Sequence, residues 1–179
     1  MAARRIDVHF HLIPKFYADM VYAAGSGPAI GRYPDWSESL ALEIMDQFDI
    51  ATALLSLGQP GVQFCKPDQA KALARRCNDY CAELNAKHGK RFGAFGTVSM
   101  WNVGDAVEEV GHCLDDLKFS GVSLFASYDG KFPLRDDVHR LLGVSGQSGL
   151  HQLSGTARRV VYVDVERIGN GESAARDLL

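Results

Sequence analysis

The stretch RIDVHFHLIP, residues 5–14, largely determines how the rest of the chain is interpreted. Asp7, His9 and His11 alternate in it with apolar residues, and a period of two predicts a β-strand. Successive side chains of a strand point to opposite faces, so the three polar residues share one face and the other is available to pack against helices. The predicted helix-facing residues are Ile6, Val8, Phe10 and Leu12. Two imidazoles on one face can converge on a metal ion, whereas a chance pair in a core strand would leave two costly polar groups to satisfy.

Length and composition favour one globular domain and argue against several classes of partner. The chain has 179 residues, of which 46% are apolar and 23% charged, and its net charge of −3 offers no basic surface for nucleic acid or for a membrane. No apolar run approaches the roughly 18 residues of a membrane span, and no signal-peptide core precedes the first strand. The four cysteines form no Cys-x-x-Cys pair. We therefore expect a cytosolic protein with its thiols in the core.

Strand and helix patterns alternate after residue 36. Residues 14–36 are predicted as a loop, because the segment AAGSGPAIGRYPDW is rich in Gly and Pro. The apolar runs at 51–57, 91–100 and 121–127 predict strands. Helices are predicted between them from apolar positions spaced three and four apart. Their starts are assigned to Ser37 or Ser39, to Asp68, and to Asn102 or Asp105.

This alternation predicts a parallel sheet whose strands are covered on both faces. An eight-stranded α/β barrel needs about 250 residues, and four strands are evident here, so the predicted fold is the N-terminal half of a (β/α)8 barrel. The predicted domain spans residues 1–134. Residues 135–179 are rich in Gly, Ser and Arg and are predicted to be a divergent, irregular tail, within which RRVVYVDV could form a strand.

The segments RIDVHFHLIPKFY, SLALEIMDQFDIATALLSLGQPGVQF and GVSLFASYDGKF, in this order, resemble the amidohydrolase superfamily. Within it the resemblance is to the branch of aminocarboxymuconate-semialdehyde, γ-resorcylate and 6-methylsalicylate decarboxylases, over about residues 4–132. It implies that His9 and His11 bind a divalent metal, usually zinc, at the mouth of the barrel. It also implies further His ligands and a catalytic Asp on later strands, for which this chain shows no match, so the catalytic residue is unassigned. The abrupt loss of resemblance suggests the hypothesis of a reading-frame change or an altered gene model near Phe132.

Other side chains near the predicted strand ends have both a functional and a structural interpretation. Ser127 and Tyr128 are the candidate substrate-binding residues, because barrel enzymes bind substrate at the carboxyl ends of strands. Asp7 either orients a ligand histidine or accepts a hydrogen bond from the backbone. Aromatic residues near the first loop either line an aromatic pocket or simply cover the barrel end. They are Phe16, Tyr17, Tyr33 and Trp36.

Three functions follow from these observations. The first is a metal-dependent decarboxylase of a small aromatic or unsaturated carboxylic acid, as the resemblance implies, impaired if the later ligands are absent and expected to be a homodimer if its fold is completed. The second is a metal-dependent hydrolase, in which metal-bound hydroxide attacks a carbonyl. The third is a non-catalytic relative, since an open half-barrel would expose strand edges that invite association.

Overall fold

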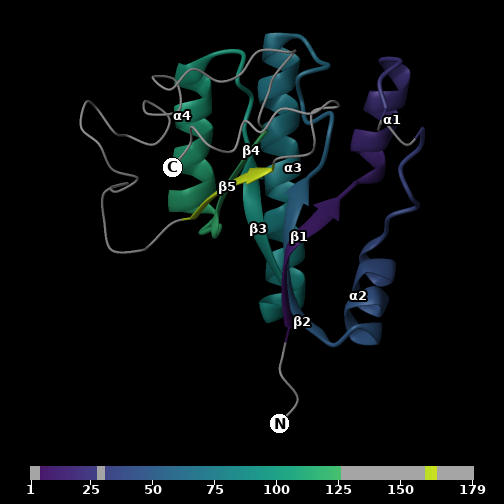
Figure 1. The fold of residues 1–179 in the computed structure, drawn as a ribbon. Helices are drawn as coiled ribbons and strands as arrows, with labels where there is room; N and C mark the ends of the chain where they lie inside the picture. The colour runs from purple at the N-terminus through teal and green to yellow at the C-terminus, as the bar shows by residue number, and fades with distance from the viewer. Residues whose placement is uncertain (1–4, 28–30, 126–159, 165–179) are drawn as a thin grey trace, which may run out of the picture.

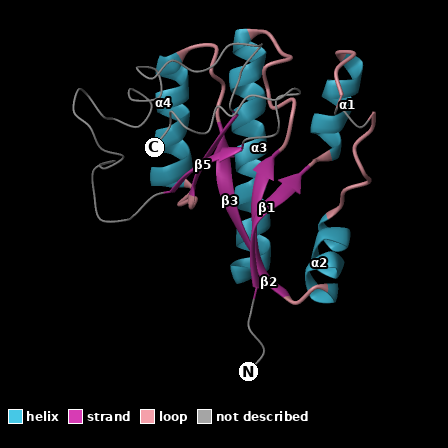
Figure 2. Ribbon diagram, in the orientation of Figure 1, coloured by secondary structure: helices cyan, strands magenta, loops and turns pink. Residues whose placement is uncertain are grey.

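The computed structural model describes residues 5–27 and 31–125 and the backbone of one further strand at 160–164. Five parallel strands form a sheet in the order β1-β2-β3-β4-β5, with helices alternating between the first four (Figures 1 and 2). The strands are β1 (Arg5–Leu12), β2 (Ile50–Leu57), β3 (Phe92–Thr97), β4 (Gly121–Phe125) and β5 (Val160–Asp164). The predicted parallel α/β fold is confirmed. β5 lies within the predicted tail and pairs with β4, whereas the boundary after residue 134 lies outside the described residues.

The helices are α1 (Lys15–Ala23), α2 (Glu38–Gln47), α3 (Pro67–His88) and α4 (Val103–Gly111). A 3₁₀ turn, η1 (Gly89–Arg91), follows α3, and a π-helical turn, η2 (His112–Asp116), continues α4. No helix in the described part of the chain is long and apolar enough to cross a membrane.

Helix starts and stops follow capping chemistry that the sequence largely predicted. Ser37 caps α2 by accepting from the backbone N–H of Leu40 at 3.1 Å, and Asn102 caps α4 by accepting from two backbone N–H groups. α3 ends at Gly89, whose φ of +57° suits glycine. The prediction that Asp68 caps α3 was wrong. Pro67 is already the first helical residue, where its missing N–H costs nothing, so Asp68 lies within the first turn.

The predicted loop at 14–36 was also wrong in its first part, because α1 occupies Lys15–Ala23. Neither Gly nor Pro occurs within these nine residues, and the composition that indicated a loop belongs to the residues that follow. Tyr17 and Val21 of α1 are buried against α3, in a cluster that includes Leu73 and Cys77. This packing stabilises a short helix that would be marginal alone.

The main core lies between one face of the sheet and α2, α3 and α4. Ala53, Leu55, Ala94, Val122 and Leu124 supply its strand side. The four cysteines of the chain are free and buried, in agreement with the predicted core thiols. Gly96 lies at this interface too: a Cβ there would come within 2.4 Å of the Cys113 Sγ, so β3 and η2 approach one another closely at that point.

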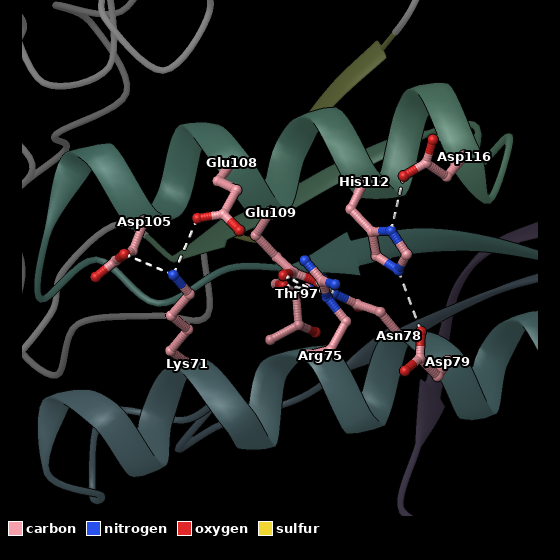
Figure 3. Close-up of polar contacts among 10 residues, drawn as sticks. All are labelled: Lys71, Arg75, Asn78, Asp79, Thr97, Asp105, Glu108, Glu109, His112 and Asp116. Carbon is pink, nitrogen blue, oxygen red and sulfur yellow. Dashed lines mark hydrogen bonds and ion pairs between the residues drawn. The ribbon is translucent and has the colours of Figure 1, made fainter.

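A polar cluster joins α3 to α4 through this core (Figure 3). Glu109 is 3% exposed and accepts from Arg75 Nε at 2.8 Å and from Asn78 Nδ2 at 2.8 Å. Asn78 also donates to the carbonyl of Thr97 at 2.9 Å and accepts from the Thr97 N–H at 2.8 Å. The buried carboxylate is thus compensated, and the end of β3 is fixed to α3.

The same helices are joined at their surface by two further sets of contacts. Lys71 forms ion pairs with Asp105 and Glu108, and His112 contacts carboxylates of Asp79 and Asp116 at 3.2 and 3.0 Å (Figure 3). Exposed pairs of this kind contribute little each, but together they align α4 along α3.

Candidate metal centre

His9 and His11 converge at the carboxyl half of β1. Their Nε2 atoms are 3.1 Å apart, and their rings meet edge to face with centroids 4.7 Å apart. Two imidazole nitrogens bound to one Zn²⁺ at about 2.0–2.1 Å with tetrahedral angles would be separated by about 3.3 Å. The two side chains therefore already have a spacing that suits one metal ion.

The alternation predicted for β1 holds only in its second half. Asp7 pairs with Ala53 and Phe10 pairs with Leu55, so β1 uses one more residue than β2 over this interval. Ile6 precedes this irregularity and Val8 lies within it. Their side chains are 64% and 48% exposed, so the prediction that they pack against helices was wrong. Among the described residues β1 pairs only with β2, so it lies at an edge of the sheet. The apolar residues in its first half are therefore not buried.

Asp7 lies at this irregularity. Its Oδ1 accepts a hydrogen bond from the backbone N–H of His9 at 2.9 Å. Of the two roles left open from the sequence, this contact supports the backbone role. The hydrogen bond fixes the backbone immediately before the histidine pair and so helps to position His9.

Three serine hydroxyls are buried at or near the carboxyl ends of the strands. Ser56 of β2 pairs in register with His11, so both side chains share the face opposite the main core. Ser123 of β4 is in register with Thr97, and Ser99 follows β3. The hydroxyls of all three serines have no hydrogen-bond partner in the structure. Buried hydroxyls normally have one, so these oxygens are available to a water molecule or a ligand.

The turn after β2, residues 58–61, covers this end of the sheet. Gly58 lies against the His11 ring, since a Cβ there would be 3.1 Å from Nδ1. The hydroxyls of Tyr17 and Tyr33 donate to carbonyls of the turn, Tyr17 to Gly61 at 2.9 Å and Tyr33 to Gln59 at 2.6 Å. Of the two roles considered for these aromatic residues, the contacts support covering the strand ends.

The described residues bring two candidate ligands together, His9 and His11. They contain no group of three or more His, Cys, Asp or Glu side chains placed to hold an ion. A catalytic zinc typically has three protein ligands and an open position. The predicted substrate residues Ser127 and Tyr128 lie outside the described residues.

Comparison with known proteins identifies the family. The amidohydrolase family model matches residues 6–151. This chain belongs to the amidohydrolase family. The 6-methylsalicylic acid decarboxylase acuB of Aspergillus aculeatus is 35% identical to this amidohydrolase over 126 residues, covering 69% of the chain and 38% of the relative. The chain thus spans less than half the length of this relative.

Two solved structures resemble this amidohydrolase. An amidohydrolase II structure matches with a TM-score of 0.71 and 27% identity, over 76% of this chain and 46% of its own. A dihydroxybenzoic acid decarboxylase from Polaromonas sp. JS666, with bound manganese and the inhibitor 2-nitroresorcinol, matches with a TM-score of 0.54 and 30% identity, over 66% of this chain and 37% of its own.

Sequence reasoning named the histidine pair, Asp7, Tyr17 and Tyr33, but it missed Gly58 and the hydrogen bonds that the two tyrosine hydroxyls make to the turn. Gly58 and the two tyrosine hydroxyls belong to the site through contacts between segments distant in sequence, which periodicity does not reveal. One local signal was present: GQPG directly after an apolar strand is typical of a tight turn. Such a turn at a strand's carboxyl end could have been assigned to the site.

Proposed function

We propose that this chain supplies His9 and His11 to the divalent-metal site of a decarboxylase that acts on a small aromatic carboxylic acid. The observation that carries the proposal is the 3.1 Å separation of the two Nε2 atoms. The relative with the manganese ion and a nitroresorcinol inhibitor, and the relative named for 6-methylsalicylic acid, support the metal and the substrate class.

Imidazole donors are compatible with zinc, and the related structure points to manganese as well. When bound, such an ion attracts the carboxylate of the substrate and stabilises the negative charge that builds up as the carbon–carbon bond weakens. His9 and His11 would hold the ion, and Asp7 would anchor the backbone between them and the start of the strand. Ser127 and Tyr128 are the proposed substrate contacts, with residues 1–134 as the barrel-forming unit.

The proposal extends to assembly and location. A homodimer is proposed, because among the described residues β1 pairs only with β2 and the apolar side chains of Ile6 and Val8 are exposed there, where a second molecule could bind. The four buried, free cysteines favour a reducing compartment, in keeping with a cytosolic enzyme.

Metal binding by the purified chain tests whether His9 and His11 are metal ligands. Titration calorimetry with Zn²⁺ and with Mn²⁺ should show one site per chain that His9→Ala and His11→Ala each abolish. His88→Ala is the matched control, because that imidazole contacts Glu38 at the far end of α3 and should leave binding unchanged. Equal binding by all four proteins would refute the proposed ligands.

Product analysis tests the reaction. The metal-loaded chain is incubated with 6-methylsalicylate and with 2,6-dihydroxybenzoate, and released carbon dioxide is measured beside the aromatic product. Decarboxylation that depends on His9 and His11 supports the proposal. Hydrolysis of an ester or lactone probe without release of carbon dioxide would instead indicate the hydrolase alternative.

A further inference from the structure

We infer that Tyr17 and Tyr33 are positioning residues for the metal centre: their hydroxyls hold the turn 58–61 against the His11 imidazole and thereby fix its orientation. The inference rests on the proposed function, because it assigns to these tyrosines a role in presenting a metal ligand. Neither tyrosine supplies a ligand atom itself.

The contact between the turn and the ligand histidine is close. A Cβ built on Gly58 would lie 3.1 Å from His11 Nδ1 and 3.3 Å from both Cγ and Cε1. These three ring atoms are approached at nearly equal distances, so the glycine backbone lies against the imidazole itself and not merely beside its edge. The absence of a side chain at residue 58 therefore leaves the ring the space it occupies.

The turn is held from outside the sheet by two phenolic hydroxyls. Tyr17, from α1, donates to the Gly61 carbonyl at 2.9 Å and lies 3.5 Å from that of Gly58. Tyr33 donates to the Gln59 carbonyl at 2.6 Å. The two hydroxyls are themselves 3.5 Å apart. Carbonyls at 58, 59 and 61 are thus gathered around one pair of donors.

The Tyr17 hydroxyl keeps its role as a hydrogen-bond donor because its proton is retained. Tyr17 is 1% exposed, and burial, reinforced by its hydrogen bond with Tyr33, raises the pKa of its phenol far above the usual range. The hydroxyl therefore keeps its proton and remains a donor throughout the physiological pH range. A buried carbonyl that lost this donor would have to find another partner, which would require the turn to move.

The turn also has a second fixed neighbour, which limits how it can move. Gly61, at φ +63°, lies so close to the Phe125 ring at the end of β4 that a Cβ would come within 2.4 Å of it. The turn is thus seated between His11 of β1 and Phe125 of β4. Releasing it from the tyrosines changes the packing on His11 without removing any ligand atom.

Removing single hydroxyls tests the inference. Tyr17→Phe and Tyr33→Phe are prepared in the full-length chain, with Tyr80→Phe as the matched control, because Tyr80 lies on α3 and its hydroxyl makes no contact with the turn. Residues behind metal-binding histidines typically change metal affinity by about 10–100-fold. We expect the Kd for Zn²⁺ to rise about 10-fold in Tyr17→Phe or Tyr33→Phe and to stay unchanged in Tyr80→Phe. If the wild type binds Zn²⁺, unchanged affinity in both test variants overturns the inference.

A second measurement separates this inference from the proposed function. The ¹H–¹³C resonance of the His11 ring, assigned with His11→Asn, is recorded without metal in each variant. A shift confined to the two test variants supports positioning even if the wild-type chain binds no metal, a result that would overturn the proposed function alone. An unshifted His11 resonance in folded variants overturns the inference, whatever the metal affinity of the wild type.

Discussion

Asn78 is expected to be among the most sensitive positions in the fold, although it is a polar residue. Its side chain is 1% exposed and makes three hydrogen bonds: to the Thr97 carbonyl, from the Thr97 N–H, and to the Glu109 carboxylate. Asn78→Ala removes all three and leaves their buried partners without this amide.

The cost can be worked out from these contacts. A hydrogen bond between neutral groups contributes about 1 kcal/mol, and one to a charged group about 1.5–3 kcal/mol. Two of the first kind and one of the second amount to about 4 kcal/mol, from which alanine's better helix propensity recovers about 0.6 kcal/mol. A net loss of about 3–4 kcal/mol is a large fraction of the 5–15 kcal/mol typical of a domain.

Urea unfolding followed by circular dichroism measures this loss. Asn85→Ala is the matched control, because Asn85 lies two turns further along α3 and its buried Oδ1 has no hydrogen-bond partner. That variant gains the same helix propensity of about 0.6 kcal/mol, so its unfolding free energy should lie within about 1 kcal/mol of the wild type. If the two variants differed by less than 1 kcal/mol, the reasoning about the cluster on Asn78 would be refuted.

Three further predictions concern other parts of the chain. Burial lowers the pKa of His112, but its two aspartate contacts outweigh this effect and raise it above 6.5. Its stabilising contribution is therefore complete below pH 6.5 and disappears as pH rises through the raised folded pKa. Urea unfolding at a series of pH values should show that the wild type loses stability above pH 6.5 by an amount that His112→Gln does not show. Gly96→Ala should lower unfolding free energy by about 1–3 kcal/mol, because its Cβ would overlap Cys113. Ile6→Thr should change the unfolding free energy of the monomer by less than about 0.5 kcal/mol, because Ile6 is 64% exposed, but should weaken the proposed homodimer in sedimentation experiments; a monomer destabilised by more than about 2 kcal/mol would contradict the exposure of this side chain.

The elements that the sequence predicted well are those whose own residues carry the signal. α2 and α4 combine a capping residue with an amphipathic stripe, and β2 and β4 are short runs of mostly apolar residues. α1 was missed because its signal is short and is followed by a segment rich in Gly and Pro. Packing of Tyr17 and Val21 against α3 decides its conformation, and that contact joins distant parts of the chain.

The candidate site likewise has one part that the sequence predicted and another that it did not. The histidine pair follows from a local period of two, whereas the 58–61 turn and its tyrosines follow from tertiary contacts that a single sequence does not encode visibly. Asn78 illustrates the limit most clearly. A polar residue between the apolar positions of α3 is expected to be solvated, and only the approach of Thr97 and Glu109 makes burial favourable there.

The convergence of the two histidines has a narrower cause than the alternation of the whole strand. The extra residue in β1 puts its first half out of phase with its second, so Ile6 and Val8 do not help to orient the strand. Beyond it, Phe10 pairs with Leu55 and Leu12 with Leu57, and both side chains pack into the core. Burial of these two residues leaves the intervening His11 on the opposite face, beside Ser56. The direction of the His11 imidazole is therefore set by the last three residues of β1 and by the turn that lies over it, whereas His9 lies within the irregularity, where Asp7 accepts a hydrogen bond from its backbone N–H.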